Sequence, residues 1–249
     1  MTTVQRIKEQ CSRLRLYHLP KVFERHCVEA REKELTHSEF LCSLLEAEIE
    51  TRDQKDLLKR LRAANLPPRH NLDEFDFNHS HSLGESRMKE LRELTWMEQA
   101  YNIILMGPSG TGKTYIASGL VHEAVRAGFR ASIMTMEDLV TTIRLKDLTP
   151  TCLAAYNRLL KLHLLAIDDI MMFPMKKEEA NAFFNLVNTL HEKASVIITT
   201  NKAPTEWAQR LDDEVLATAI LDRLMYRCQI IKLSGESYRM ANRKTIFKD

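Results

Sequence analysis

The sequence contains little of what marks secreted, zinc-binding or membrane proteins. Its 249 residues include only five cysteines, which are scattered and form no CxxC pair. We therefore expect reduced thiols, with neither disulfides nor a zinc site. No apolar run approaches the ~18 residues that a membrane-spanning helix needs, and the charged N-terminal residues do not fit a secretion signal. These absences predict a cytoplasmic protein with no membrane partner.

A strong excess of charge of either sign is also missing. The chain has 36 Lys and Arg residues against 34 Asp and Glu residues, a formal net charge of +2. Any surface that binds nucleic acid must therefore be local, because the molecule as a whole has no strongly basic field. Hydrophobic residues make up 44% of the chain, which is enough to bury a substantial core.

Glycine is absent from residues 1–66, and Pro20 is the only proline there. This composition predicts helices with few interruptions, and we assign residues 1–66 to a small all-helical N-terminal domain that binds DNA or a partner. Thr36 and Glu39 have the spacing of a capping box at the start of its third helix. Residues 67–86 are the expected linker, and residues 87–249 are the expected nucleotide-binding domain.

The helical domain carries two clusters of basic residues. Lys and Arg side chains bind phosphates whatever the base sequence, so both clusters are candidate DNA contacts. A solvated helix face of mixed charge explains each cluster equally well. The first cluster is Arg6, Lys8, Arg13 and Arg15, and the second is Lys55, Lys59, Arg60 and Arg62.

The most specific signal is a glycine-rich stretch between an apolar run (102–106) and a helix-compatible segment (115–127). This strand–loop–helix context is that of a phosphate-binding P-loop. Its backbone N–H groups would surround the phosphates of ATP, Lys113 would reach the β- and γ-phosphates, and the Thr114 hydroxyl would bind Mg²⁺. The expected nucleotide-binding residues are Gly107, Pro108, Ser109, Gly110, Thr111, Gly112, Lys113, Thr114 and Tyr115.

Paired carboxylates follow a second apolar run, as in a Walker B strand. Asp168 would hold Mg²⁺, and Asp169 would polarise the attacking water. The alternative is that the pair caps the next helix. Asn201 ends a further apolar run, at the edge of a parallel sheet where ligands bind, and we expect it to orient the same water.

Two aromatic residues, Phe75 and Phe77, lie within the otherwise polar linker. One interpretation is that they pack onto the core of the following domain. The other is that one of them covers the base of the nucleotide. The residues alone leave both interpretations open, so Phe75 and Phe77 are included among the candidate nucleotide-binding residues.

The motifs in this order resemble an AAA+ ATPase, and within that group the IstB-like transposition ATPases, which are related to DnaC and DnaA. The resemblance spans essentially the whole chain. It implies an α/β fold, in which a parallel P-loop sheet flanked by helices follows a small all-α N-terminal domain. It rests on GPSGTGKT (107–114), LLAIDD (164–169), IITTN (197–201), AILDRL (219–224) and ESYR (236–239).

The resemblance also implies roles for single residues. Asn201 would be the sensor-1 residue, and Arg239 the sensor-2 arginine that contacts the nucleotide. Arg223, or less favourably Arg227, would be the arginine finger that enters the site of a neighbouring subunit. The insert before the Walker B strand contains Arg144 and Lys146, which would touch DNA. This role is assigned from their position in the sequence only.

The function that the resemblance implies is ATP-dependent regulation of transposition. With ATP and Mg²⁺ bound, the protein would form a ring or helical homo-oligomer on double-stranded DNA, remodel it and recruit a transposase. ATP hydrolysis would determine when the oligomer disassembles. Hydrolysis would be slow, because Asp169 stands where many AAA+ proteins have Glu. The alternatives are a DnaC-like helicase loader, a monomeric P-loop kinase for a small molecule, and a scaffold that does not hydrolyse ATP.

Overall fold

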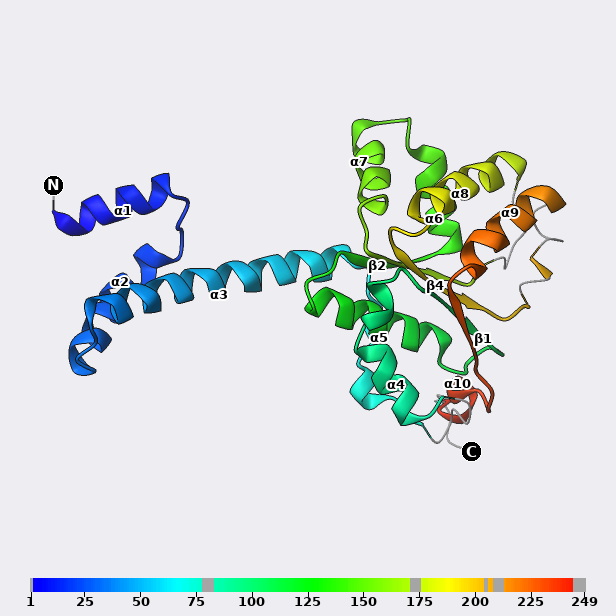
Figure 1. The fold of residues 1–249 in the computed structure, drawn as a ribbon, viewed down its shortest axis with the longest axis horizontal. Coiled ribbons are helices and arrows are strands. Elements are labelled where there is room, and N and C mark those ends of the chain that lie inside the picture. The colour runs from blue at the N-terminus through cyan, green and yellow to red at the C-terminus, as the bar shows by residue number, and fades with distance from the viewer. Residues whose placement is uncertain (1, 78–82, 171–175, 204–205, 208–212, 244–249) are drawn as a thin grey trace. The chain divides into compact units, whose positions relative to one another are not determined.

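The structure is a computed structural model that describes residues 2–77, 83–170, 176–203, 206–207 and 213–243. By its internal contacts the chain divides into two compact units, residues 1–59 and 60–249. The described residues of the first unit form helices, and the second unit is a sheet covered by helices (Figure 1). Each unit has a hydrophobic core of its own.

The first unit has a small core in which Cys11, Leu19 and Leu44 are buried. The capping box predicted at its third helix is confirmed, because Thr36 and Glu39 each accept the backbone N–H of the other through their side chains. The unit consists of α1 (Thr3–Arg13), α2 (Leu19–Glu32) and most of α3 (His37–Ala63), the end of which belongs to the second unit.

Glu48 on α3 is a buried carboxylate, only 4% exposed, that caps a different helix. It accepts the backbone N–H groups of Tyr17, His18 and Leu19 at 3.1, 2.7 and 2.8 Å, and Arg52 Nε donates to it at 3.1 Å. Burial alone would raise the pKa of Glu48, but these donors outweigh burial and lower it. Glu48 therefore supplies the cap that α2 lacks, since His18 makes no capping bond with its side chain.

The second unit is built on a parallel sheet of five strands in the order β2-β3-β4-β1-β5. Its middle strands β3, β4 and β1 are buried almost throughout, as strands covered on both faces must be. Their carboxyl ends lie side by side, which brings the segments after all three together. The strands are β1 (Asn102–Met106), β2 (Ala131–Thr135), β3 (Leu164–Asp168), β4 (Ser195–Thr200) and β5 (Cys228–Lys232), of which β5 was not expected.

Helices cover both faces of this sheet, with α4 and α5 on one face and α6, α8 and α9 on the other (Figure 1). The predicted α/β architecture is therefore confirmed. None of the helices in the described residues is long and apolar enough to cross a membrane. The helices are α4 (Glu85–Arg92), α5 (Lys113–Arg126), α6 (Met136–Leu145), α7 (Pro150–Leu159), α8 (Lys177–Leu190), α9 (Glu214–Met225) and α10 (Tyr238–Ala241), with the short 3₁₀ turns η1 (Leu72–Glu74) and η2 (Thr95–Met97).

The insert before β3 contains two helices, α6 and α7, rather than one continuous helix. Thr149 caps the second by accepting the N–H of Cys152 at 3.2 Å, and Pro150 is its first residue. Proline interrupts a continuing helix because it has no N–H and clashes with the preceding turn, but it fits the first turn of a new one.

Residues just before the expected linker belong to the sheet unit. The carbonyl oxygen of Ala64 accepts the N–H of Ile133 at 2.9 Å and the hydroxyl of Ser132 at 3.3 Å. Both donors lie on β2, which is an edge strand of the sheet. These bonds explain why the division by contacts falls between residues 59 and 60, earlier than the boundary at residue 66 that composition indicates.

Candidate nucleotide-binding site

The glycine-rich loop (107–112) joins the carboxyl end of β1 to the start of α5. Gly110 and Gly112 have φ angles of +86° and +93°, in the left-handed region that side chains disfavour. At Gly107, an added Cβ would come 2.2 Å from the carbonyl oxygen of Leu233. The loop therefore needs glycine at all three positions for local reasons, and its context is that of a P-loop.

Lys113 is the first residue of α5, and its side chain reaches back to this loop. Its ammonium donates hydrogen bonds to the carbonyl oxygens of Gly107 at 2.8 Å and Pro108 at 2.7 Å, and the residue is buried. Burial lowers the pKa of Lys113, and the charges of Asp169 and Asp168 oppose that effect. The ammonium is thus held beside the backbone that binds phosphates in P-loops.

Asp168, at the end of β3, is held by two hydroxyl groups. Thr114 Oγ1 donates to its two carboxylate oxygens at 2.9 and 3.1 Å, and Thr199 Oγ1 donates to Oδ1. Mg²⁺ prefers oxygen ligands and usually takes one or two from the protein beside phosphate and water. A hydroxyl and a carboxylate in contact at the start of the P-loop helix therefore fit the predicted Mg²⁺ ligands, Thr114 and Asp168.

Thr199 also fixes the backbone of the second acidic residue, Asp169. The N–H of Asp169, a residue with φ of +55°, donates to Thr199 Oγ1 at 2.9 Å. Partial burial and the charge of Asp168 raise the pKa of Asp169, while Lys113 and Arg239 oppose the rise. A raised pKa suits a group that accepts a proton from water. Asp168 and Asp169 do not cap α8, the next described helix, because the N-cap of α8 is Lys176.

Asn201 and Arg239 both lie near the loop, although the sequence separates them from it. Asn201 is exposed directly after β4, and the preceding carbonyl, of Thr200, accepts the N–H of Gly107 at 3.1 Å. Arg239, on α10, is exposed; its charge adds to the lowering of the pKa of Lys113 and opposes the rise in the pKa of Asp169. The start of α10 is fixed to the loop, since the N–H of Tyr238 donates to the carbonyl oxygen of Gly110 at 3.0 Å.

The two linker aromatics lie at the P-loop. A Cβ on Gly112 would come 3.2 Å from a ring carbon of Phe75. The ring of Phe75 is 5.0 Å from that of Phe77 and 6.0 Å from that of Tyr115, and the Tyr115 hydroxyl donates to the carbonyl oxygen of Asn71. Phe75 and Phe77 remain half-exposed there, so a role in covering the nucleotide base stays a prediction.

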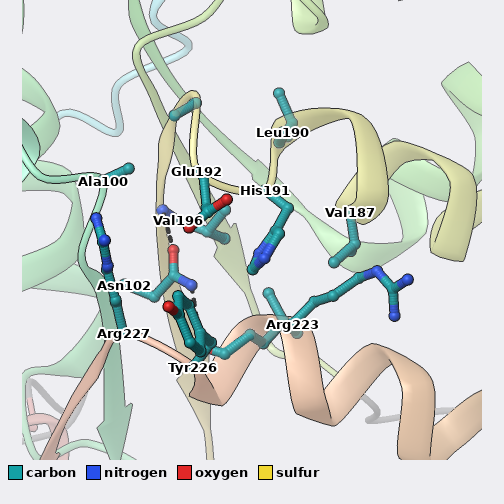
Figure 2. Close-up of a pocket in the computed structure, with 12 residues that line it drawn as sticks. Ala100, Asn102, Val187, Leu190, His191, Glu192, Val196, Arg223, Tyr226 and Arg227 are labelled. Atoms are coloured by element: carbon teal, nitrogen blue, oxygen red, sulfur yellow. Dashed lines mark hydrogen bonds between the residues drawn. The ribbon is translucent and has the colours of Figure 1, made fainter.

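Arg223 and Arg227 are not brought to the P-loop of the same chain. The carbonyl oxygen of Arg227 accepts the N–H of Asn102, the first residue of β1, at 2.7 Å. The P-loop, in contrast, follows the last residue of β1. The five residues of β1 span roughly 15 Å. Both arginines line one pocket at this amino-terminal edge (Figure 2). Arg223 donates to Asn188 Oδ1 at 2.8 Å and lies over the ring of Phe184 at 4.7 Å.

The predicted DNA-binding residues lie on helices or directly after them. Arg144 approaches Glu179 at 3.8 Å, Lys146 lies over the ring of Tyr156 at 5.1 Å, and Lys59 pairs with Asp56 at 3.0 Å. Their role in DNA binding stays a prediction. The exposed members of the set are Arg6, Lys8, Arg13, Arg15, Lys55, Lys59, Arg62 and Arg144, while Arg60 and Lys146 are half-buried.

Sequence similarity identifies the family. The sequence pattern of the family described as IstB-like ATP binding protein matches residues 9–246. The chain is 48% identical over 252 residues to an IS21-like insertion-sequence ATP-binding protein of Bacteroides fragilis, covering 100% of this chain and 96% of that protein. It is 38% identical to an IS21 ATP-binding protein of Pseudomonas aeruginosa, covering 94% and 88%.

Solved structures with a similar fold come from replication proteins. DnaI has a TM-score of 0.55 at 19% identity, over 67% of this chain and 92% of that one. AMPPCP-bound DnaA from Aquifex aeolicus has a TM-score of 0.54 at 23% identity, over 68% and 51%. The DnaC helicase loader has a TM-score of 0.52 at 17% identity, over 66% and 97%. The fold is thus the AAA+ fold, and the chain belongs to the IstB-like ATP-binding protein family, the ATP-binding helpers of IS21-type insertion sequences.

Proposed function

We propose that this protein hydrolyses ATP at a site shared between two copies of the chain. In the ATP-bound form the copies assemble on double-stranded DNA and recruit a transposase. One observation supports the proposal: the glycine loop, Thr114 and Asp168 lie at the carboxyl ends of the strands, whereas Arg223 and Arg227 lie near the amino end of β1.

The chain's own residues supply most of the chemistry. Lys113 would bind the β- and γ-phosphates, and Thr114 with Asp168 would hold Mg²⁺, which supplies charge neutralisation when bound. Asp169, whose pKa is raised, would accept a proton from the attacking water. Asn201 would orient that water from the end of β4.

The missing part is a cation for the charge that develops on the transferred phosphate. An arginine finger supplied by a neighbour is worth ~10³–10⁵ in rate. Since roughly 15 Å of β1 separates Arg227 from its own P-loop, we infer that Arg223 or Arg227 acts on the site of an adjacent copy. Hydrolysis would then proceed only in the assembled state.

Assembly on duplex DNA is supported by the family and by the exposed basic residues. The relatives belong to insertion sequences, whose movement requires DNA as a substrate and a transposase as an enzyme. Eight of the ten predicted contacts are exposed on helices or directly after them. Binding to phosphates would be independent of base sequence and would weaken as the salt concentration rises.

Lys113→Ala tests the nucleotide dependence of assembly, with Lys89→Ala, an exposed lysine on α4, as the matched control. Sedimentation velocity with ATP and a random duplex should show large complexes for the natural protein and for the control, and mainly small species for Lys113→Ala. Normal complexes from Lys113→Ala would refute the idea that ATP governs assembly.

The main rival is a helicase loader, because DnaC and DnaI share the fold, and a DnaA structure with the same fold contains single-stranded DNA. Measuring ATP-dependent affinity for duplex and for single-stranded DNA of equal length separates the two functions. A loader should prefer the single strand, whereas the proposed function requires preference for the duplex.

A further inference from the structure

Asn102, the first residue of β1, is a buried amide that connects three separate segments. It is 7% exposed. Its Nδ2 donates to the carbonyl oxygen of Leu224 at 2.9 Å, its Oδ1 accepts the N–H of Val196 at 2.9 Å, and its own N–H donates to the carbonyl oxygen of Arg227 at 2.7 Å. A buried amide with both ends satisfied fixes its surroundings closely, because any displacement leaves a polar group without a partner.

Two of the three contacts of Asn102, those to Leu224 and Arg227, fall on the segment that carries both candidate finger arginines. Leu224 lies in the last turn of α9, where carbonyl groups have no partner within the helix, and it directly follows Arg223. Arg227 is fixed by its backbone to Asn102 and by its guanidinium, which donates to the carbonyl oxygen of Gln99 at 2.9 Å. In Figure 2 Asn102 lies between the two arginine side chains, which extend to opposite sides of it.

We propose that Asn102 is a positioning residue for the arginine that each copy presents to its neighbour. The inference rests on the proposed shared site and names the contact that fixes the finger. Asn102 lies at the opposite end of β1 from the P-loop of its own chain. Its loss should therefore slow hydrolysis in the adjacent copy and leave nucleotide binding in its own copy nearly unchanged.

Mixed assemblies can separate these two effects. A subunit with Asp169→Asn still binds ATP and lends an arginine, but it has no carboxylate to accept the proton of the attacking water; we refer to it as the lender. A subunit with both Arg223→Ala and Arg227→Ala has an intact P-loop but lends nothing; we refer to it as the host. Each alone should hydrolyse ATP poorly on duplex DNA, and an equal mixture should recover turnover at the sites formed between the two.

Asn102→Asp is then introduced into either the lender or the host. An Asp carboxylate still accepts the N–H of Val196 but cannot donate to the carbonyl oxygen of Leu224. We expect recovered turnover to fall at least about tenfold with the substitution in the lender, given the ~10³–10⁵ that a finger contributes. In the host the same substitution should change turnover less than about twofold. Asn181→Asp, at an exposed position on α8, should have no effect in either subunit.

The two placements also control for folding, because any loss of stability is the same in both subunits. Asn102→Ser, whose side chain is too short for both partners, is the second variant if Asn102→Asp melts before assembly. Recovered turnover that falls equally in both placements, or in neither, overturns the inference alone. A starting mixture that recovers no turnover overturns the shared site itself and the inference with it.

Discussion

The hydroxyl of Thr199 connects the carboxylate of Asp168 to the backbone N–H of Asp169, and replacing it tests the proposed Mg²⁺ chemistry. Thr199 Oγ1 donates to Asp168 Oδ1 and accepts the N–H of Asp169. Thr199→Val keeps nearly the same shape within β4 but removes both bonds. Of the two hydroxyl groups that donate to Asp168, only that of Thr114 then remains. The N–H of Asp169 loses its acceptor.

The size of the effect follows from the bonds that are lost. A hydrogen bond to a charged group contributes ~1.5–3 kcal/mol, and one between neutral groups contributes about 0.5–1.5 kcal/mol. Part of that energy appears as lower stability. For Mg²⁺, removing a group that orients a ligand lowers affinity or activity about 10–100-fold. We therefore expect Thr199→Val to raise the half-saturating Mg²⁺ concentration by roughly tenfold or more.

The assay is ATP turnover on duplex DNA as a function of Mg²⁺ concentration, with urea unfolding measured in parallel. Thr199→Ser, which keeps the hydroxyl, is the matched control and should remain close to the natural protein in half-saturating Mg²⁺. If Thr199→Val and the natural protein saturate at the same Mg²⁺ concentration, Thr199 does not hold Asp168 for the metal, and the reasoning is wrong.

Three further outcomes are expected. Glu48→Gln should lower the stability of the N-terminal unit by about 1–3 kcal/mol in urea unfolding, whereas Glu46→Gln, at an exposed position, should change it little. The pKa of Glu48 is lowered in the folded protein. Its contribution to stability is therefore present above the ordinary pKa of a Glu and is lost as the pH falls through the pKa of the folded state. Gly110→Ala should weaken ATP binding in calorimetry, because its Cβ would come 2.1 Å from Ser237 Oγ, whereas Gly128→Ala, at an equally left-handed φ in open space, should not. Phe75→Ala should weaken ATP binding about fivefold, because it removes ~1 kcal/mol of ring stacking, whereas Phe75→Tyr, the control, keeps the ring. An affinity for ATP that is unchanged in Phe75→Ala would exclude the base-covering role.

Contiguous motifs made much of the site predictable. The P-loop could be recognised because a strand, a glycine loop and a helix follow one another directly, within residues 102–126, as phosphate binding requires. Thr114 and Asp168 were assigned to Mg²⁺ from two separate motifs, and the structure brings the two side chains into contact. The helical front end followed from the lack of glycine and from the capping box at Thr36.

The residues that were not predicted act across long sequence separations. Thr199 lies inside an apolar strand, and its role depends on β4 lying beside β3, which a single sequence does not reveal. Ser237 and Tyr238 meet Gly110 only because β5 returns the chain to β1. Asn102 looks like an ordinary strand start until Leu224 and Val196 are brought to it. The break before α7 is different, since Thr149-Pro150 is a local signal for a helix start.

The bond between Ala64 and Ile133 has a practical consequence for anyone who wishes to isolate the ATPase. β2 is at the edge of the sheet, and an uncovered edge strand invites pairing with foreign strands and precipitation. A fragment that begins at Pro67, the first residue of the expected linker, would lack Ala64 and leave the Ile133 N–H exposed. A fragment that begins before residue 60 keeps this cover and should remain in solution at higher concentration.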